Sequence, residues 1–233
     1  MKNLSSEEIY KRRFKDDIEF RIKMWKVLCE NYFQRYIPSH STVLEIGAGY
    51  CEFINNISAK RKIAIDINPD TIYQANDDVQ VIITPSNDLS QIETGSIDII
   101  FVSNFFEHIS KEEIIKTIKE CFRCLRNNAN ILILQPNIRY IYRNYWMFFD
   151  HITPIDDRSL CEVLEMIGFD IQLVLPKFLP YTSKSKLPKS LFLIKIYLKI
   201  SILYKIFGGQ AFIVAKKVNT SLPRKNNMEF KNV

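Results

Sequence analysis

Histidine and cysteine are sparse in this chain of 233 residues, which contains three histidines and five cysteines. They do not cluster at the spacing of metal ligands, so the sequence predicts no metal site. A G-x-S-x-G motif is also absent, which argues against Ser-His-Asp nucleophile chemistry. The cysteines are odd in number and scattered, which suits reduced thiols rather than a disulfide framework. They are Cys29, Cys51, Cys121, Cys124 and Cys161.

Long hydrophobic runs are missing as well. No uncharged apolar run reaches the roughly 18 residues that would suggest a membrane span. The first 21 residues hold 11 charged side chains and lack the apolar core of a secretory signal. We therefore expect a cytoplasmic protein, with peripheral binding to the inner membrane as a further possibility.

Acidic residues are absent from residues 171–228, which hold 11 basic side chains. Residues 1–170 hold 20 basic and 25 acidic side chains, a balance of −5. A charge distribution this one-sided predicts an anionic partner, for which a membrane surface at 186–207 is our candidate. A solvated basic surface with no partner is the alternative.

Two consecutive segments carry the strongest pattern in the chain. In the first, an apolar strand containing Glu45 runs into Gly47-Ala-Gly49, which predicts a tight turn followed by a helix. In the second, an apolar strand ends in Asp66, 21 residues after Glu45. In nucleotide-binding α/β folds, an acid at this place accepts hydrogen bonds from both ribose hydroxyls. A structural strand–turn–helix with a surface aspartate is the alternative.

Together with residues 97–108, these segments resemble the class I S-adenosylmethionine-dependent methyltransferases. The resemblance covers about residues 40 to 217 by the order of its elements. In detail the chain is similar to bacterial methyltransferases found with surface-glycan biosynthesis. That closer match rests on residues 53–57, 103–108 and 145–151.

The resemblance implies that S-adenosylmethionine binds beyond the carboxyl ends of the strands. Asp88 follows the third strand, where the family contacts the adenine ring. Cys51 stands where the family usually has a third glycine, so we expect the turn to avoid positive φ there. The expected cofactor-binding residues are Glu45, Gly47, Gly49, Asp66, Asp88, Ser103 and Asn104.

Short buried strands alternate with helical segments after residue 41, which predicts a Rossmann-like α/β fold with helices on both faces of a mostly parallel sheet. The family resemblance implies seven strands, the last of them antiparallel. We expect strands near 42–46, 62–66, 79–83, 98–102, 130–135, 169–175 and 210–216. Helices are expected near 51–58, 69–75, 111–125 and 157–167.

Three segments lie outside this alternation. Residues 1–40 are expected to form a helical cap, with an apolar stripe of Ile18, Ile22, Trp25, Leu28, Cys29 and Phe33. Tyr10, Arg12 and Arg13 precede the stripe and could close over a ligand. Residues 176–209 form a basic, apolar helical insertion that suits either a membrane surface or a packed lid. Its predicted stripe is Phe192, Ile196, Ile200, Leu203 and Phe207. Residues 218–233 are expected to be a flexible tail.

Histidine is the usual general base when a hydroxyl accepts a methyl group. His151 ends an aromatic loop after the fifth strand, and His108 follows the fourth, so both are expected on the cofactor side of the sheet. We favour His151 as the catalytic residue and His108 second. A structural hydrogen-bonding role for each stays open. The aromatic loop suits a sugar ring or a packed lid.

The spaced motifs therefore predict a methyltransferase, and the resemblance together with the charge asymmetry implies that it acts on a hydroxyl of a sugar or glycan-linked acceptor. Residues 103–106 lack the prolines of an Asn-Pro-Pro-Tyr-like motif, and there is no recognisable RNA-binding appendage, which argues against nucleic acid as a partner. Methylation of another small molecule or lipid is an alternative. A nicotinamide-dependent oxidoreductase is another alternative, since it would share the first strand and Asp66. The non-enzymatic alternative is a membrane-associated scaffold that binds the cofactor without catalysis.

Overall fold

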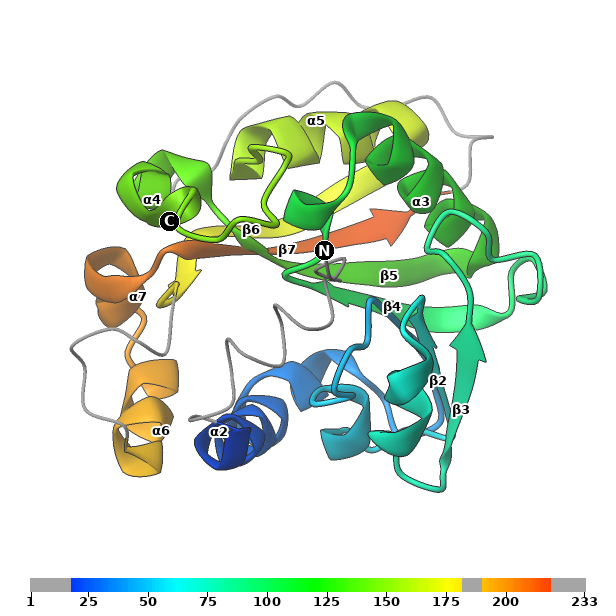
Figure 1. Ribbon diagram of the computed structural model, residues 1–233, viewed down its shortest axis with the longest axis horizontal. Helices are drawn as coiled ribbons and strands as arrows, with labels where there is room; N and C mark the ends of the chain where they lie inside the picture. Colours follow the sequence, from blue (N-terminus) through cyan, green and yellow to red (C-terminus); the bar gives the residue numbers. More distant parts are fainter. Residues whose placement is uncertain (1–17, 182–189, 219–233) are drawn as a thin grey trace, which may run out of the picture.

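The computed structural model describes residues 18–181 and 190–218 and contains one seven-stranded sheet in the order β3-β2-β1-β4-β5-β7-β6 (Figure 1). Neighbouring strands from β3 through β5 pair in parallel, whereas β7 is antiparallel to both β5 and β6. The predicted α/β fold with an antiparallel last strand is confirmed. The strands are β1 Thr42–Ile46, β2 Arg61–Asp66, β3 Val79–Ile83, β4 Ile97–Ser103, β5 Leu125–Pro136, β6 Phe169–Leu179 and β7 Gln210–Lys217.

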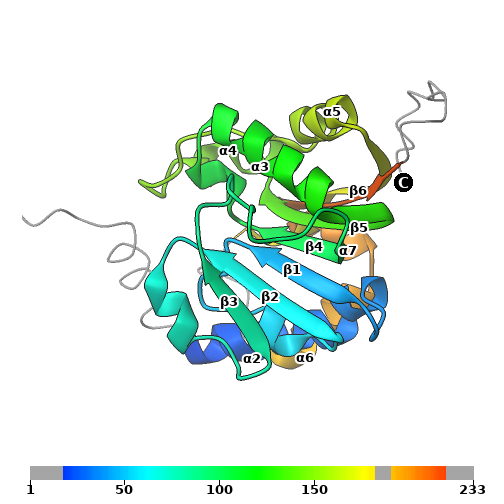
Figure 2. The same cartoon turned by 90° about the vertical axis from the view of Figure 1, so that its right-hand side faces the viewer.

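Helices cover both faces of the sheet, with α3 and α5 on one side and α2 and α6 on the other (Figure 2). Both faces are apolar, as expected for parallel strands buried between helical layers. Two hydrophobic clusters result, one centred on Phe33, Phe53 and Phe101 and one on isoleucines such as Ile100 and Ile133. The α-helices are α2 Ile18–Asn31, α3 Lys111–Cys124, α4 Ile138–Tyr145, α5 Asp157–Ile167, α6 Leu191–Lys199 and α7 Ile202–Phe207.

Local capping explains where the two longest central helices begin. Ser110 and Glu113 form a reciprocal capping box at the start of α3. Asp156 caps α5 by accepting from the backbone of Ser159, and Gly168 ends that helix at φ +122°. Both helices were predicted within one residue of these bounds.

The helices predicted at 51–58 and 69–75 are wrong. The structure has only the 3₁₀ turns η2 Ile54–Asn56 and η3 Pro69–Tyr73. Asparagine side chains take up backbone groups that a continuing helix would use: Asn55 donates to the carbonyl of Gln74, and Asn56 to that of Glu52. Such local bonds compete with helix formation. Two further short 3₁₀ segments are η1 Phe33–Tyr36 and η4 Phe106–His108.

The N-terminal helix is rotated from the predicted stripe. Trp25, Leu28, Cys29 and Phe33 are buried as expected, but Ile18 and Ile22 are exposed. Arg21 is buried in their place, one turn before Trp25. The inward face therefore begins with an arginine. The predicted role of residues 10–13 lies outside the described residues.

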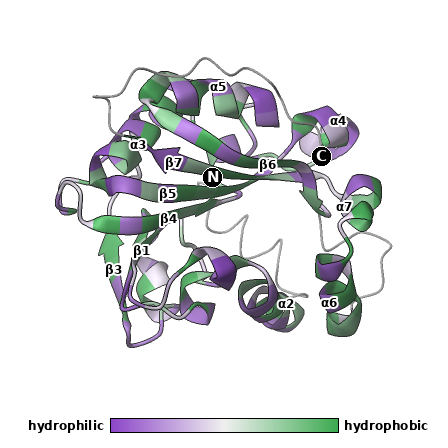
Figure 3. Ribbon diagram, turned by 180° about the vertical axis from the view of Figure 1, so that it is seen from behind, coloured by the Kyte–Doolittle hydropathy of each residue, from purple (hydrophilic) through white to green (hydrophobic). Residues whose placement is uncertain are grey.

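The insertion forms two short helices, since the chain leaves helical geometry at Ile200. The buried side chains of these two helices are Leu198 and Tyr204, whereas Phe192, in the predicted stripe, is 69% exposed. The break at Ile200 changes which residues face inward. Hydrophobic and hydrophilic stretches alternate on the ribbon of α6 and α7 at the edge of the molecule (Figure 3). No helix in the described part of the chain combines the length and apolarity needed to cross a bilayer. Residues 186–189 and the predicted tail from 219 lie outside the described residues.

Candidate active site

The glycine turn after β1 is tied to the end of β2 by backbone hydrogen bonds. The N–H groups of Gly47 and Ala48 both donate to the carbonyl oxygen of Ile65, at 2.9 and 3.0 Å. Asp66 then receives two more: its Oδ2 accepts from Gly49 N at 2.7 Å, and its Oδ1 accepts from Asn68 N at 2.8 Å. The carboxylate predicted to meet a ribose thus also holds the two strand ends together.

The turn passes through the left-handed region three times, at Gly47 (φ +67°), Gly49 (φ +49°) and Cys51 (φ +56°). The expectation that the chain avoids positive φ at Cys51 is therefore wrong. The Cys51 side chain is fully buried, and its Sγ lies 3.9 Å from the carbonyl oxygen of Thr71. Packing thus holds a backbone conformation that the residue disfavours by itself.

A pocket opens above this turn. It brings together Glu45, Gly47, Gly49, Ser103 and Asn104, five of the seven residues expected to bind the cofactor. Its remaining lining residues are Arg21, Trp25, Ala48, Tyr50, Glu52 and Phe53. They come from the carboxyl ends of β1 and β4, from the turn, and from α2.

The other two predicted residues lie outside this lining. Asp66 contacts it through Gly49. Asp88 is exposed in the turn after β3, where its Oδ1 accepts from Ser90 N at 3.1 Å and hydrogen bonding to Ser90 lowers its pKa. The structure thus gives Asp88 a local turn role.

Glu45 lies on the floor of the pocket. Its side chain is buried, and Oε2 accepts from Ile54 N at 3.1 Å. Burial raises the pKa of Glu45 well above its ordinary value, opposed by that hydrogen bond. The residue therefore fixes the segment after the turn and holds a proton more tightly than an exposed glutamate.

Arg21 and Glu52 were not predicted as site residues. Arg21 Nε donates to Glu52 Oε1 at 3.0 Å, and a second guanidinium nitrogen bonds the other carboxylate oxygen. This bidentate pair, about one-tenth exposed on each side, joins α2 to the segment after the glycine turn. One sequence signal could have indicated that Arg21 is buried. It lies four residues before Trp25 and therefore on the same face of the helix.

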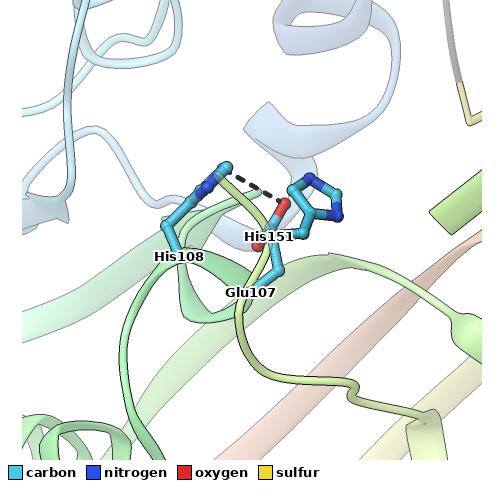
Figure 4. Close-up of side chains that lie close together, drawn as sticks. All are labelled: Glu107, His108 and His151. Carbon is cyan, nitrogen blue, oxygen red and sulfur yellow. Dashed lines mark ion pairs between the residues drawn. The ribbon is translucent and has the colours of Figure 1, made fainter. Parts of the chain in front are cut away.

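A second group forms where the segment after β4 meets the loop after α4. Glu107, His108 and His151 lie together there, with the Glu107 carboxylate between the two imidazole rings (Figure 4). The rings of His108 and His151 have centroids 5.0 Å apart. The structure thus brings together the two histidines predicted to be catalytic, which are 43 residues apart in sequence.

Hydrogen bonds fix the two loops to each other. The carbonyl of Glu107 accepts from Ile152 N at 2.9 Å and from Thr153 N at 3.2 Å. His108 Nδ1 lies 3.0 Å from the carbonyl oxygen of Asp150. Thr153 donates to the Ile109 carbonyl at 2.6 Å. Hydrogen bonds between the segment after β4 and the loop after α4 therefore hold the two histidines together.

Glu107 had no predicted role, yet it is 1% exposed and central to this group. Its Oε2 accepts from Gln135 Nε2 at 2.9 Å, at the carboxyl end of β5. Burial raises the pKa of Glu107, while His108 lowers it. Only three residues of the chain separate Asn104, in the pocket, from His108.

The aromatic loop divides into a packed part and an exposed part. Tyr145 is buried and donates to the Thr153 carbonyl at 2.5 Å. Its ring and that of Phe148 lie 4.9 and 5.3 Å from that of His151. Trp146 and Phe149 are exposed. The loop therefore holds His151 in place and also presents aromatic rings to solvent.

Comparison with known proteins identifies the family. A family model described as a methyltransferase domain matches residues 19–174. A search of curated proteins gave no match. Among solved structures, a SAM-dependent methyltransferase from Archaeoglobus fulgidus is 21% identical, covers 91% of this chain and 100% of that chain, and has a TM-score of 0.67.

Two further structures have named activities. A possible histamine N-methyltransferase from Thermotoga maritima is 16% identical over 90% of this chain and 98% of that one, with a TM-score of 0.62. A geranyl diphosphate C-methyltransferase from Streptomyces coelicolor is 13% identical over 81% and 80%, with a TM-score of 0.57. Its structure holds Mg²⁺, geranyl diphosphate and S-adenosyl-L-homocysteine.

At these identities the solved structures establish the fold, and the family model establishes the relationship because it spans more than half of the chain. The chain therefore belongs to the methyltransferase-domain family and has the fold of S-adenosylmethionine-dependent methyltransferases.

Proposed function

We propose that this methyltransferase transfers the methyl group of S-adenosylmethionine to a hydroxyl of a sugar or glycan-linked acceptor. The observation that carries the proposal is that His151 meets His108, which lies four residues after the pocket residue Asn104 at the end of β4. Two imidazoles there suit the removal of a hydroxyl proton.

The residues around the glycine turn fit the cofactor. Gly49 carries no Cβ and has nothing within 4 Å where one would stand, so a ligand can approach the backbone closely there, whereas the Phe105 ring fills that space at Gly47. Asp66 has oxygen lone pairs left after its two backbone bonds and suits ribose hydroxyls. Ser103 and Asn104 suit the polar methionine end of the cofactor. S-adenosylmethionine supplies an activated methyl group, so alignment of the two substrates provides most of the catalysis.

Exposed aromatic rings in the loop that contains His151 support a sugar acceptor. Trp146 and Phe149 are exposed, and Tyr145 connects Trp146 to His151. Flat aromatic faces present a large apolar surface, which suits the C–H face of a sugar ring. The resemblance to glycan-associated methyltransferases in residues 145–151 points to the same acceptor class.

A screen of lipid-linked and nucleotide sugars for methyl incorporation tests the acceptor. His151→Ala should lower methyl transfer by about 10²–10⁴-fold, the usual contribution of a general base, whereas exposed His40→Ala should leave it unchanged. Methylation of non-sugar acceptors only, or equal activity of the two variants, would contradict the proposal.

The α6–α7 segment supports contact with an anionic membrane surface. Phe192, Ile202 and Ile206 are exposed, as are Lys195, Lys199 and Lys205. Apolar side chains flanked by lysines are typical of helices that lie in a membrane interface. This contact would keep the enzyme near a lipid-linked acceptor.

Co-sedimentation with anionic vesicles tests this contact. Changing Lys195, Lys199 and Lys205 to Glu should abolish sedimentation. A control triple, Lys111, Lys116 and Lys119 to Glu, lies on α3, across the sheet, and should sediment like the wild type. Equal sedimentation of both triples would remove the membrane proposal.

A further inference from the structure

We propose that Glu107, His108 and His151 form a binding site for a divalent transition-metal ion such as Zn²⁺. Each offers one ligand atom, and the three atoms lie within 4.8 Å of one another. Two histidines and one carboxylate are a common ligand set for such ions. The sequence suggested no metal because the residues meet only through the fold.

The separation of the ligand atoms suits a shared ion better than a direct bond. His108 Nε2 and Glu107 Oε1 are 3.7 Å apart, beyond hydrogen-bond range. Ligands about 2.0–2.2 Å from one metal lie roughly 3–4 Å from each other at tetrahedral or wider angles. An ion between the two atoms would therefore need little movement of either side chain.

The surroundings of each ligand already have the form of an outer shell. His108 Nδ1 lies 3.0 Å from the Asp150 carbonyl oxygen, so the Nδ1–H tautomer directs its Nε2 lone pair at Glu107. Gln135 Nε2 donates a hydrogen bond to Glu107 Oε2, which leaves Oε1 for an ion. Partners of this kind orient metal ligands and fix the histidine tautomer.

Charge favours a cation here. The Glu107 carboxylate is 1% exposed, and within the described ranges no lysine or arginine pairs with it. A buried carboxylate needs a proton or a positive charge nearby. The His108 side chain is 24% exposed, so the site has an opening through which an ion can enter.

Three protein ligands leave at least one position of the ion open. A hydroxyl oxygen bound there would lose its proton to solvent at a lower pH than a free hydroxyl. This role rests on the proposed function, because it assumes a hydroxyl acceptor, whereas ion binding does not. In the ion-bound state the two histidines would serve as ligands, and the ion instead of a free imidazole would assist the loss of the hydroxyl proton.

Cobalt provides a spectroscopic probe, since Co²⁺ in a histidine–carboxylate site gives visible d–d absorption. Titration of the chelator-treated full chain should show one Co²⁺ per chain, displaced by Zn²⁺. Glu107→Gln and His151→Ala should weaken binding more than about 100-fold, and Gln135→Leu by about 10- to 100-fold. His40→Ala, at an exposed histidine, should bind like the wild type. All five cysteines are buried, so thiolates do not compete.

Circular dichroism of each variant checks that it folds. Should Glu107→Gln or His151→Ala unfold, His108→Ala at the more exposed ligand gives the same comparison. Absence of Co²⁺ binding, or equal binding by the wild type and the ligand variants, would overturn the site. Specific Co²⁺ binding without methylation of any sugar would keep the site and reject the acceptor. Sugar methylation by a chain that binds no ion would reject the metal site and keep the acceptor.

Discussion

Asp66 Oδ2 accepts a hydrogen bond of 2.7 Å from the backbone N–H of Gly49. This bond joins the end of β2 to the glycine turn after β1. Asp98 forms a comparable contact at the opposite end of the strands, where its Oδ2 accepts from Thr42 N at 2.8 Å. One aspartate adjoins the proposed cofactor site, and the other, at the start of β4, lies away from it.

Asp66→Asn and Asp98→Asn should destabilise the protein to a similar degree. Each change replaces one accepting oxygen by a donor amide. Asp66→Asn can then accept from only one of its two backbone N–H partners, and Asp98→Asn can no longer accept from both Thr42 N and Arg126. The free energy of unfolding should fall by about 1.5–3 kcal/mol in both, as measured by urea denaturation. A loss confined to one of them would show that the two contacts are not equivalent.

Gly47→Ala should be more harmful than Gly49→Ala. A Cβ at Gly47 would lie 2.5 Å from the Phe105 ring, whereas a Cβ at Gly49 would meet nothing within 4 Å. Both residues have positive φ, which costs an alanine about 1–2 kcal/mol. The clash at Gly47 should add about 1–3 kcal/mol.

Urea denaturation measures both losses. The double variant Gly47→Ala/Phe105→Ala should lose less stability than the sum of the losses in Gly47→Ala and Phe105→Ala alone, because without the ring the added methyl has room. If the two losses are simply additive, the packing of Phe105 on Gly47 is not what requires a glycine there.

Replacing Glu45 should change how stability depends on pH. Burial raises the pKa of Glu45 above its ordinary value of 4.5, so the folded state binds this proton more tightly than the unfolded state. The resulting stabilisation is full below about pH 4.5 and is lost as pH rises through the folded-state pKa. Glu45→Gln does not titrate, and its amide oxygen can still accept from Ile54 N.

The stability of Glu45→Gln relative to the wild type should therefore increase with pH above about 4.5. Urea denaturation at about pH 5 and about pH 8 gives this difference. Glu93→Gln, at an exposed position, is the control and should show no such trend. A constant difference between Glu45→Gln and the wild type would contradict the raised pKa.

Arg21→Met should destabilise the protein strongly, because it leaves the buried Glu52 carboxylate without its bidentate partner. The expected loss is about 3–5 kcal/mol of unfolding free energy. Arg21→Met/Glu52→Leu should recover most of it, since no buried charge remains. Lys23→Met breaks an exposed pair with Glu19 on the same helix and should leave the free energy of unfolding nearly unchanged. No recovery in the double variant would indicate that the pair acts mainly through packing.

Sequence reasoning succeeded where a residue's role follows from its neighbours in the chain. Apolar runs ending in Glu45-Ile-Gly47 and in Asp66 located β1, β2 and the turn between them. It failed where side chains change the backbone locally, as Asn55 and Asn56 do after the turn. The left-handed φ of Cys51 was also missed, because tertiary packing holds it.

The rest of the candidate site depends on contacts between distant segments. Arg21 and Glu52 are 31 residues apart, and their pairing needs α2 to cross the turn. Glu107 and His151 meet only because the loop after α4 bonds to the segment after β4. Periodicity within a segment contains no information about contacts between distant segments. The sequence therefore predicted each histidine separately but not their cluster with Glu107.

Calorimetric titration with S-adenosylmethionine tests the central claim most directly, that the cofactor binds across the ends of β1 and β2. The wild type and Asp98→Asn should bind one equivalent with equal affinity. Asp66→Asn should bind roughly 10- to 100-fold more weakly, as expected for the loss of a charged hydrogen-bond acceptor. Equal affinity of all three proteins, or binding of a nicotinamide cofactor instead, would contradict the account.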